Sequence, residues 1–430
     1  MMEELRAEAG SLPLWMLAEV LDAEDELGSF RSEFHFPKGK EVTYLCGNSL
    51  GLQPKRIRDA VNADLDRWAK FGVEGHFLEE EPGVPWWTIE DICKKDLASV
   101  VGARAEEVAV MNSLTVNLHL LLAAFYAPTE DSYEIVIEAH AFPSDEYAVQ
   151  SVVEKHGLDA SMAVVRLDAT NTADLCAQIR ERGSKVAVVL IAPLQYYTGT
   201  LYNIRDIVVA ARSIGAVAGF DLAHAVGNVE VNLHDDDADF ACWCSYKYLN
   251  AGPGAIGGAF VHAKYVEDET FPAKQALRGW WGNKRETRFD MKPTFDPLPG
   301  VAGLQLSNPP TLPVLALREA LSLTAEAGLP RLRRKSIKLT AYLELLLREA
   351  LGDTFSMLTP SNPDERGAQL SLLFVNHDVD AIFEGLRRRH VFVDVRRPDV
   401  IRVAPAPLYN SFKDVSRFVT HLKDAIAELE

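Results

Sequence analysis

Lys247 is the only charged residue in an apolar and aromatic stretch, residues 240–248, and glycines follow soon after it. A buried ammonium group is destabilising unless another group pairs with it or its pKa falls. Asp221 ends an earlier apolar stretch, and His224 follows it on an expected turn. Where two such stretches are neighbouring strands of a buried sheet, their ends meet at the edge where ligands bind. The sequence therefore predicts an amine and a carboxylate at one site.

Pyridoxal phosphate (PLP) is the cofactor that needs this pair of groups. A lysine holds PLP covalently, and a carboxylate keeps the pyridine nitrogen protonated. Desolvation lowers the pKa of the lysine and makes it a nucleophile and proton carrier. Taken alone, Asp221 could equally be a helix N-cap, and Lys247 could be a lysine whose stem lies on an apolar surface. The glycines expected to let the backbone turn and approach a cofactor are Gly252, Gly254, Gly257 and Gly258.

Two further stretches could complete a cofactor site. Ser113 and Thr115 lie between a predicted strand and an amphipathic helix, whose first N–H groups, with the Thr115 hydroxyl, would bind a phosphate. Ordinary capping of that helix by either residue is equally favoured. In residues 140–148, Phe142 could stack on a planar ring, although a lone Phe is more often part of the core. Asp145 could cap a helix or hold a neighbouring group.

The composition limits the classes of function. Of 430 residues, 48% are hydrophobic and 25% charged, as in soluble globular proteins of two or three domains. The net charge of −18 argues against nucleic acid and anionic membrane surfaces as partners. No apolar run reaches the roughly 20 residues of a membrane span. The acidic N-terminal residues show no basic region followed by an apolar stretch, so we expect no secretory signal. Five scattered cysteines fit neither a disulfide framework nor a zinc ribbon, so we expect a cytoplasmic protein.

One acidic loop could suggest a metal. HDDDAD, residues 234–239, holds four aspartates and a histidine before a predicted strand. Such loops are more often solvated turns, so we predict no metal site.

Short apolar stretches alternate with helical patterns across residues 108–262, which is typical of an α/β fold with a mostly parallel sheet. The predicted strands are 108–111, 134–138, 185–192, 216–221, 240–247 and 255–261, and the helices between them include 117–126, 145–156 and 204–213. After a turn-rich segment, 292–310, a long helical pattern covers 313–351 with an interruption at 328–330. The rest predicts a smaller α+β domain, with strands at 369–375, 391–395 and 400–404 and helices at 378–389 and 413–429.

Several motifs together resemble the kynureninase family, PLP-dependent enzymes of the aspartate-aminotransferase-like superfold. They are LCGNSLGLQPK (45–55), MNSLTVNLHLLL (111–122), EAHAFPSDEYA (138–148), YYTGTLYNI (196–204), the long block 219–262, SNPP (307–310) and IRVAPAPLYNSF (401–412). The resemblance runs from about residue 40 to the C-terminus. It implies a large PLP-binding domain, 45–304, with a seven-stranded sheet, and a small domain made of 1–44 and 305–430. It also implies a homodimer whose active sites lie near the subunit interface.

The family activity is hydrolytic cleavage of the Cβ–Cγ bond of L-kynurenine or 3-hydroxy-L-kynurenine to L-alanine and anthranilate or 3-hydroxyanthranilate. The reaction belongs to tryptophan breakdown by the kynurenine pathway and to the supply of NAD precursors. By motif, Lys247 matches the lysine that binds PLP, Asp221 the partner of the pyridine nitrogen, and Phe142 the ring-stacking residue. Further cofactor positions match Leu114, Thr115, Asp145, His224, Tyr246, Trp280 and Asn308.

The resemblance also assigns substrate contacts. Arg402 matches the arginine that binds the substrate α-carboxylate, which a planar guanidinium can hold through two hydrogen bonds. Without the motif, a surface arginine on a strand would be favoured. Tyr246 is the candidate for assisting proton transfers with the phosphate. His76, Ser307 and Asn308 resemble members that prefer the 3-hydroxylated substrate, because a His and an Asn can hydrogen-bond a ring hydroxyl. The segment 79–87 departs from the basic stretch typical of the family.

Two other functions remain as alternatives. Another PLP enzyme of the same superfold, such as a desulfurase-like lyase or an aminotransferase, would share the lysine and the aspartate. A desulfurase needs a reactive cysteine in the small domain, and all five cysteines here precede residue 245. A PLP-binding protein without activity would have lost Lys247 or Arg402, and both are present.

Overall fold

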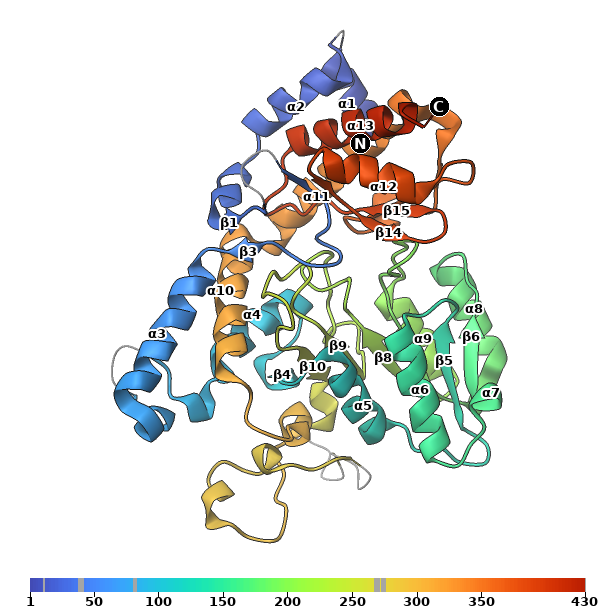
Figure 1. Cartoon of the computed structure of the whole chain (residues 1–430). Coiled ribbons are helices and arrows are strands. Elements are labelled where there is room, and N and C mark those ends of the chain that lie inside the picture. The colour runs from blue at the N-terminus through green and yellow to red at the C-terminus, as the bar shows by residue number, and fades with distance from the viewer. Residues whose placement is uncertain (11, 38–41, 80–82, 267–270, 272–275, 430) are drawn as a thin grey trace.

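A seven-stranded sheet forms the centre of the computed structural model (Figure 1), which describes the chain except residues 11, 38–41, 80–82, 267–270, 272–275 and 430. The strand order is β4-β10-β9-β8-β7-β5-β6. The strands are β4 (Val108–Val110), β5 (Glu134–Glu138), β6 (Val164–Leu167), β7 (Val186–Ile191), β8 (Val217–Asp221), β9 (Phe240–Trp243) and β10 (Gly258–Val261). All neighbours pair in parallel except β10, which is antiparallel to β4 and β9. The expected α/β fold with a mostly parallel sheet is confirmed.

Helices cover both faces of this sheet, which explains why its strands are apolar at consecutive positions. One face packs against α4 (Asp91–Val101), α8 (Thr172–Arg182), α9 (Ile204–Ser213) and α10 (Thr311–Ala327). The other packs against α5 (Leu114–Phe125), α6 (Pro143–Lys155) and the short α7 (Ala160–Ala163). Phe220 and Trp243 point to the first face, and Phe240 and Cys242 to the second. The sheet is therefore buried on both sides.

The structure corrects the sequence prediction at two strands. β9 ends at Trp243, so Tyr246 and Lys247 lie in the turn that follows and not on the strand itself. The edge strand β6, where Arg166 is exposed between apolar neighbours, was not predicted. An edge strand has only one neighbour, so its apolar pattern is shorter and weaker than that of a central strand.

The chain ends form a second unit with its own apolar core. Its antiparallel sheet has the order β11-β12-β15-β14. The strands are β11 (Ser356–Met357), β12 (Leu370–Leu373), β14 (Asp394–Arg396) and β15 (Val400–Val403), and the helices are α1 (Met2–Ala9), α2 (Leu14–Ala23), α11 (Leu329–Leu351), α12 (Val379–Arg388) and α13 (Phe412–Ala427). The helices of the N-terminal segment pack on α11 and α13 at the top of Figure 1, so both ends of the chain share this core.

Further elements connect the two units. The helical pattern of residues 313–351 is two helices, α10 and α11, that meet at Gly328, where φ is +78°. α10 runs beside α3 (Arg56–Phe71) along one flank of the molecule (Figure 1). Two separate two-stranded sheets are also present: β1 (Phe34–His35) pairs with β3 (Gln53–Pro54), and β2 (Thr43–Tyr44) pairs with β13 (Val391–Phe392). Among the described residues, no helix has the length and apolar character to cross a membrane.

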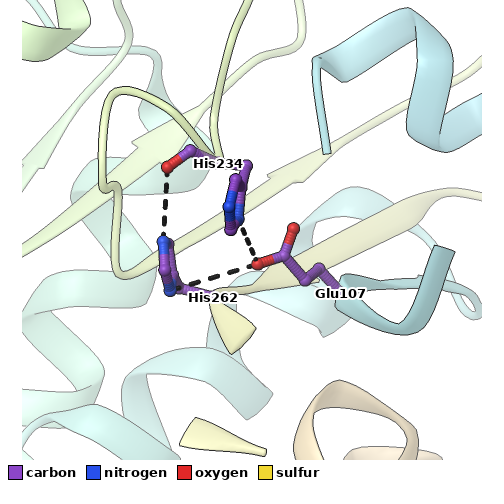
Figure 2. Close-up of side chains that lie close together, drawn as sticks. All are labelled: Glu107, His234 and His262. Carbon is purple, nitrogen blue, oxygen red and sulfur yellow. Dashed lines mark hydrogen bonds and ion pairs between the residues drawn. The ribbon is translucent and has the colours of Figure 1, made fainter. Parts of the chain in front are cut away.

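Glu107, His234 and His262 lie close together (Figure 2). Glu107 directly precedes β4, so the cluster lies at the amino ends of the parallel strands, whereas Asp221 lies at the carboxyl end of β8. Glu107 Oε1 accepts hydrogen bonds from His234 Nδ1 at 2.8 Å and from the Ala263 N–H at 2.6 Å. Its Oε2 accepts the Arg104 N–H at 2.8 Å. The two imidazoles stack with centroids 4.9 Å apart and planes at 13°, so their in-plane lone pairs do not converge on one point. Hydrogen bonding, not metal ligation, accounts for this geometry.

The HDDDAD loop is only partly the solvated turn that the sequence suggested. Asp239 is buried and accepts hydrogen bonds from the Ala218 N–H at 2.7 Å and the Tyr265 hydroxyl at 2.9 Å. Asp237 forms ion pairs with Arg212 and Lys264. The loop therefore holds the N-terminal end of β9 against β8 and the segment after β10.

We expect Glu107→Gln to lower the free energy of unfolding by about 2–3 kcal/mol, because the amide leaves a buried donor facing other donors. Glu106→Gln, one residue earlier and exposed, is the control and should change it by less than about 0.5 kcal/mol. Urea unfolding of both variants at pH 7.5 makes the comparison. Equal stability of the two variants would contradict a structural role for the cluster.

The same cluster gives stability a pH dependence. Burial lowers the pKa of His262, so the unfolded chain takes up its proton first and stability falls as pH drops below the ordinary histidine range. Burial alone would raise the pKa of Glu107, but hydrogen bonds from Arg104, His234 and Ala263 outweigh it and lower that pKa. Its contribution is therefore lost at more acidic pH, when the carboxylate becomes protonated.

Candidate active site

Lys247 and Asp221 meet at the carboxyl ends of two neighbouring strands. Asp221 is the last residue of β8, opposite Cys242 of the parallel strand β9. The turn after β9 carries Lys247 back toward β8, where its Nζ lies 2.9 Å from Nε2 of His224. Asp221 Oδ1 accepts the Ala223 N–H at 2.7 Å, so the same carboxylate also organises the turn that holds His224. The turn-forming interpretation of Asp221 is therefore confirmed, and the structure also places its carboxylate in the same cavity as Lys247.

A cavity opens over this pair of side chains. It is lined by eight residues that the sequence singled out: Leu114, Thr115, Phe142, Asp145, Asp221, His224, Tyr246 and Lys247. Further lining comes from Ser144, Ala192, Leu194, Tyr196 and Ala223. These residues come from five segments at the carboxyl ends of β4, β5, β7, β8 and β9, where the topology of the fold predicts a ligand site.

Burial sets the protonation of the basic groups. Burial lowers the pKa of Lys247, and the nearby carboxylates only partly compensate. Burial also holds the pKa of His224 well below its ordinary value, and the positive charge of Lys247 lowers it further. His224 is therefore neutral and able to accept a hydrogen bond from the Lys247 amine. The amine is correspondingly easier to deprotonate than a surface lysine.

Three buried carboxyl groups lie near one another at the base of the site. Burial raises the pKa of Asp145 well above its ordinary value, and the charges of Asp221 and Glu138 raise it further. Burial raises the pKa of Glu138 to about 7. Burial raises the pKa of Asp221 too, but the Ala223 N–H, Lys247 and a hydrogen bond from Asp145 act against that increase. Asp221 is thus the carboxyl group best able to carry the negative charge.

The opposite side of the cavity presents hydrogen-bond donors. α5 begins at Leu114, and neither Ser113 nor Thr115 caps it through a side chain, so the ordinary capping alternative is wrong. The first N–H groups of that helix therefore remain available to an anion. Phe142, at the start of α6, is 46% exposed and meets the Tyr196 ring edge-on at 5.3 Å between centroids. Its large exposed surface suits stacking on a ligand ring.

Arg402 lies behind the cavity, at the contact between the two units. It is 1% exposed, so the alternative of a surface arginine is wrong. Its Nη1 donates to the Tyr196 carbonyl at 2.6 Å, and its Nη2 donates to Asp394 Oδ2 at 2.5 Å. Its Nε is buried without a hydrogen-bond partner among the described residues.

Besides Arg402, four predicted residues do not line the Lys247 cavity. His76 lies in a separate hollow beside Trp86 and Leu312. Trp280 is 46% exposed, and its indole nitrogen donates to the Arg288 carbonyl at 3.0 Å. Ser307 and Asn308 are exposed neighbours whose side chains lie 3.2 Å apart. Within the segment 79–87, residues 80–82 lie outside the described part of the chain.

Sequence reasoning missed two residues that help to build the site, Tyr196 and Gly51. It also expected four glycines to lie at the cavity. Tyr196 was given no role, although its position soon after a buried strand could have identified it as a residue of the site. A Cβ on Gly51 would lie 2.4 Å from the Lys247 carbonyl oxygen, so only glycine allows this approach. Gly252 and Gly254 turn the chain as expected, with φ of +97° and +66°, but they line a different hollow. Gly257 and Gly258 pack against Trp243, so none of the four lines the cavity.

These residues fit PLP. The cavity combines a lysine of lowered pKa, a carboxylate, free helix N–H groups and an exposed ring, and Asp145 Oδ1 is buried without a hydrogen-bond partner in the described structure. Burial raises the pKa of Tyr246, so its phenol stays protonated and acts as a donor. Burial also raises the pKa of every cysteine thiol, so none is the thiolate that a desulfurase needs.

Comparison with solved structures shows the fold. The apo cysteine desulfurase from Thermococcus onnurineus NA1 superposes with a TM-score of 0.75 at 16% identity, covering 95% of this chain and 98% of that chain. The C-DES mutant K223A, with glycine covalently linked to its PLP cofactor, also gives 0.75 at 16% identity, covering 92% of this chain and 99% of that one. Identities this low carry no argument about activity.

Sequence comparison shows the family. The family model for the kynureninase C-terminal domain matches residues 332–422. Curated kynureninases from Monosiga brevicollis and Myxococcus xanthus are each 46% identical, over 95% of this chain and 95% of the first relative, and over 94% of this chain and 96% of the second. The kynureninase from Nematostella vectensis is 43% identical over 95% of this chain and 93% of its own length. The chain therefore belongs to the kynureninase family of PLP-dependent hydrolases.

Proposed function

We propose that this protein hydrolyses the Cβ–Cγ bond of kynurenines, with Lys247, Asp221, Tyr246 and Arg402 as its principal working residues. The observation that carries the proposal is the buried meeting of Lys247 with Asp221 and His224 in one cavity. When bound, PLP withdraws electrons from the substrate carbon next to the amine. Lys247, with its lowered pKa, can take the proton that this carbon releases.

The other residues bind, orient and supply protons. Asp221 would pair with the pyridine nitrogen of PLP, because Asp145 and Glu138 have raised pKa values and stay neutral more readily. The first N–H groups of α5 would hold the phosphate of PLP. Tyr246 remains a phenol and can donate a proton within the cavity. Arg402 binds the substrate α-carboxylate from its buried position behind Tyr196. Raised thiol pKa values count against the desulfurase alternative.

We further propose that two copies of the chain form a homodimer. Phe77, Trp280 and Phe289 are exposed, and together with the half-buried Trp87 they form a cluster of aromatic rings with centroids 5.5–6.3 Å apart. An exposed apolar surface of this kind favours a partner. Trp280 and Asn308, which do not line the cavity of their own chain, would then reach the cavity of the other subunit. We also retain the two-domain division at 45–304 and 1–44 with 305–430, and a cytoplasmic location.

Mixed dimers test the shared site. One subunit carries Lys247→Ala and the other Asn308→Ala, with different affinity tags. If Asn308 acts on the partner's cavity, one of the two sites is fully native and activity returns to about half of the wild-type value. If Asn308 acts within its own chain, the mixed dimer should show at most half the activity of Asn308→Ala. That second result would contradict a shared site.

We also propose that 3-hydroxykynurenine is the better substrate. A side chain built to hydrogen-bond the ring hydroxyl discriminates against substrates that lack it. We expect kcat/KM for 3-hydroxykynurenine to exceed that for kynurenine by about tenfold, and Asn308→Ala to remove most of this difference. Kynurenine serves as the control substrate for the variant. Equal or reversed ratios in the PLP-saturated wild type would contradict the preference.

A further inference from the structure

Asp394 and Arg402 are directly paired residues on neighbouring antiparallel strands, β14 and β15. Asp394 is 8% exposed and Arg402 1% exposed. Asp394 Oδ2 accepts a hydrogen bond from Arg402 Nη2 at 2.5 Å, and its Oδ1 accepts one from Arg396 Nη1 at 2.6 Å. One carboxylate therefore holds two guanidinium groups, one through each oxygen.

The Arg402 guanidinium is fixed on two sides. Asp394 holds Nη2 within the small domain, and the Tyr196 carbonyl holds Nη1 at the edge of the Lys247 cavity. The Tyr196 carbonyl also accepts a hydrogen bond from Gln369 Nε2 at 2.9 Å, so its own position is fixed. With both ends held, the plane of the guanidinium cannot rotate freely, and a planar donor binds a carboxylate well only in one plane.

Asp394, Arg396 and Arg402 together carry a net charge of plus one. Asp394 alone would cancel the charge of Arg402 and leave no attraction for an anionic ligand. Arg396, whose side chain is 35% exposed, restores a net charge of plus one. That charge matches one carboxylate. Burial and the charge of Lys247 lower the pKa of His224 most, and the charges of Arg402 and Arg396 lower it further, so both guanidinium groups act on a residue that lines the Lys247 cavity.

We propose that Asp394 is a positioning residue that orients Arg402 toward the α-carboxylate of the substrate, and that Arg396 preserves the positive charge of the pair. The inference rests on the proposed function, in which Arg402 binds that carboxylate. A purely structural ion pair would instead stabilise the contact between β14 and β15 without affecting one ligand group more than another.

The variant Asp394→Asn tests whether the orientation of Arg402 or the net charge of the group governs binding of the α-carboxylate. The amide keeps the size of the side chain but weakens its hold on Arg402, while the net charge rises to plus two. If orientation matters, KM for kynurenine and the dissociation constant of L-alanine, which carries the α-carboxylate, should each rise about tenfold. The inhibition constant of 2-aminoacetophenone, which has the aryl ketone but no carboxylate, should stay within about twofold, and kcat should fall by less than about threefold.

Two control variants accompany the measurement in the PLP-loaded enzyme. Asp380→Asn removes a surface carboxylate that pairs with Arg397 and should change no constant. Asp394→Glu keeps the charge and should restore part of the L-alanine affinity. If Asp394→Asn does not fold, Arg396→Gln provides the test instead. This variant should raise the dissociation constant of L-alanine about tenfold and leave the inhibition constant of 2-aminoacetophenone unchanged.

Three results for Asp394→Asn would overturn the proposal. They are unchanged binding of L-alanine, tighter binding of L-alanine from the added charge, or an equal loss of affinity for L-alanine and 2-aminoacetophenone. Failure of the wild type to cleave kynurenine would refute the proposed function instead. The L-alanine measurement would still report on the carboxylate site in that case.

Discussion

Placing the Lys247 amine in a buried cavity is the constraint on which the rest of the site depends. Burial lowers the pKa of this amine, and its neighbour His224 stays neutral, so the two can share a hydrogen bond at 2.9 Å without repulsion. The parallel pairing of β8 and β9 supplies the carboxylate of Asp221 beside them. Without that carboxylate the buried positive charge would have little compensation.

Burial also decides which of the three carboxyl groups near Lys247 carries a negative charge. Asp145 and Glu138 have raised pKa values, so they can remain neutral while Asp221 carries the negative charge. Sets of acids whose environments push their pKa values apart are characteristic of sites that hold charge at one chosen atom. The same principle applies at Arg402. The buried carboxylate of Asp394 orients its guanidinium group, and the second guanidinium, of Arg396, restores a net positive charge.

The sequence predicted the central sheet and the Lys247–Asp221 pair because both follow from local patterns. Consecutive apolar residues mark doubly buried strands, and polar residues at their ends mark the site. Arg402 was found by resemblance, since its burial depends on packing between distant segments. Asp394 and Tyr196 were missed for the same reason: the strand register and the contact between the two units decide their roles, and local patterns do not encode either. The turn after β9, which displaces Lys247 from the strand, also escaped prediction.

The most direct measurement is borohydride reduction of the PLP-loaded enzyme followed by peptide mapping with mass spectrometry. Reduction makes the bond between PLP and its lysine permanent. We expect the cofactor on the peptide that contains Lys247, and no labelled peptide in Lys247→Ala. Cofactor on another lysine, or on no peptide of an active enzyme, would contradict the central assignment.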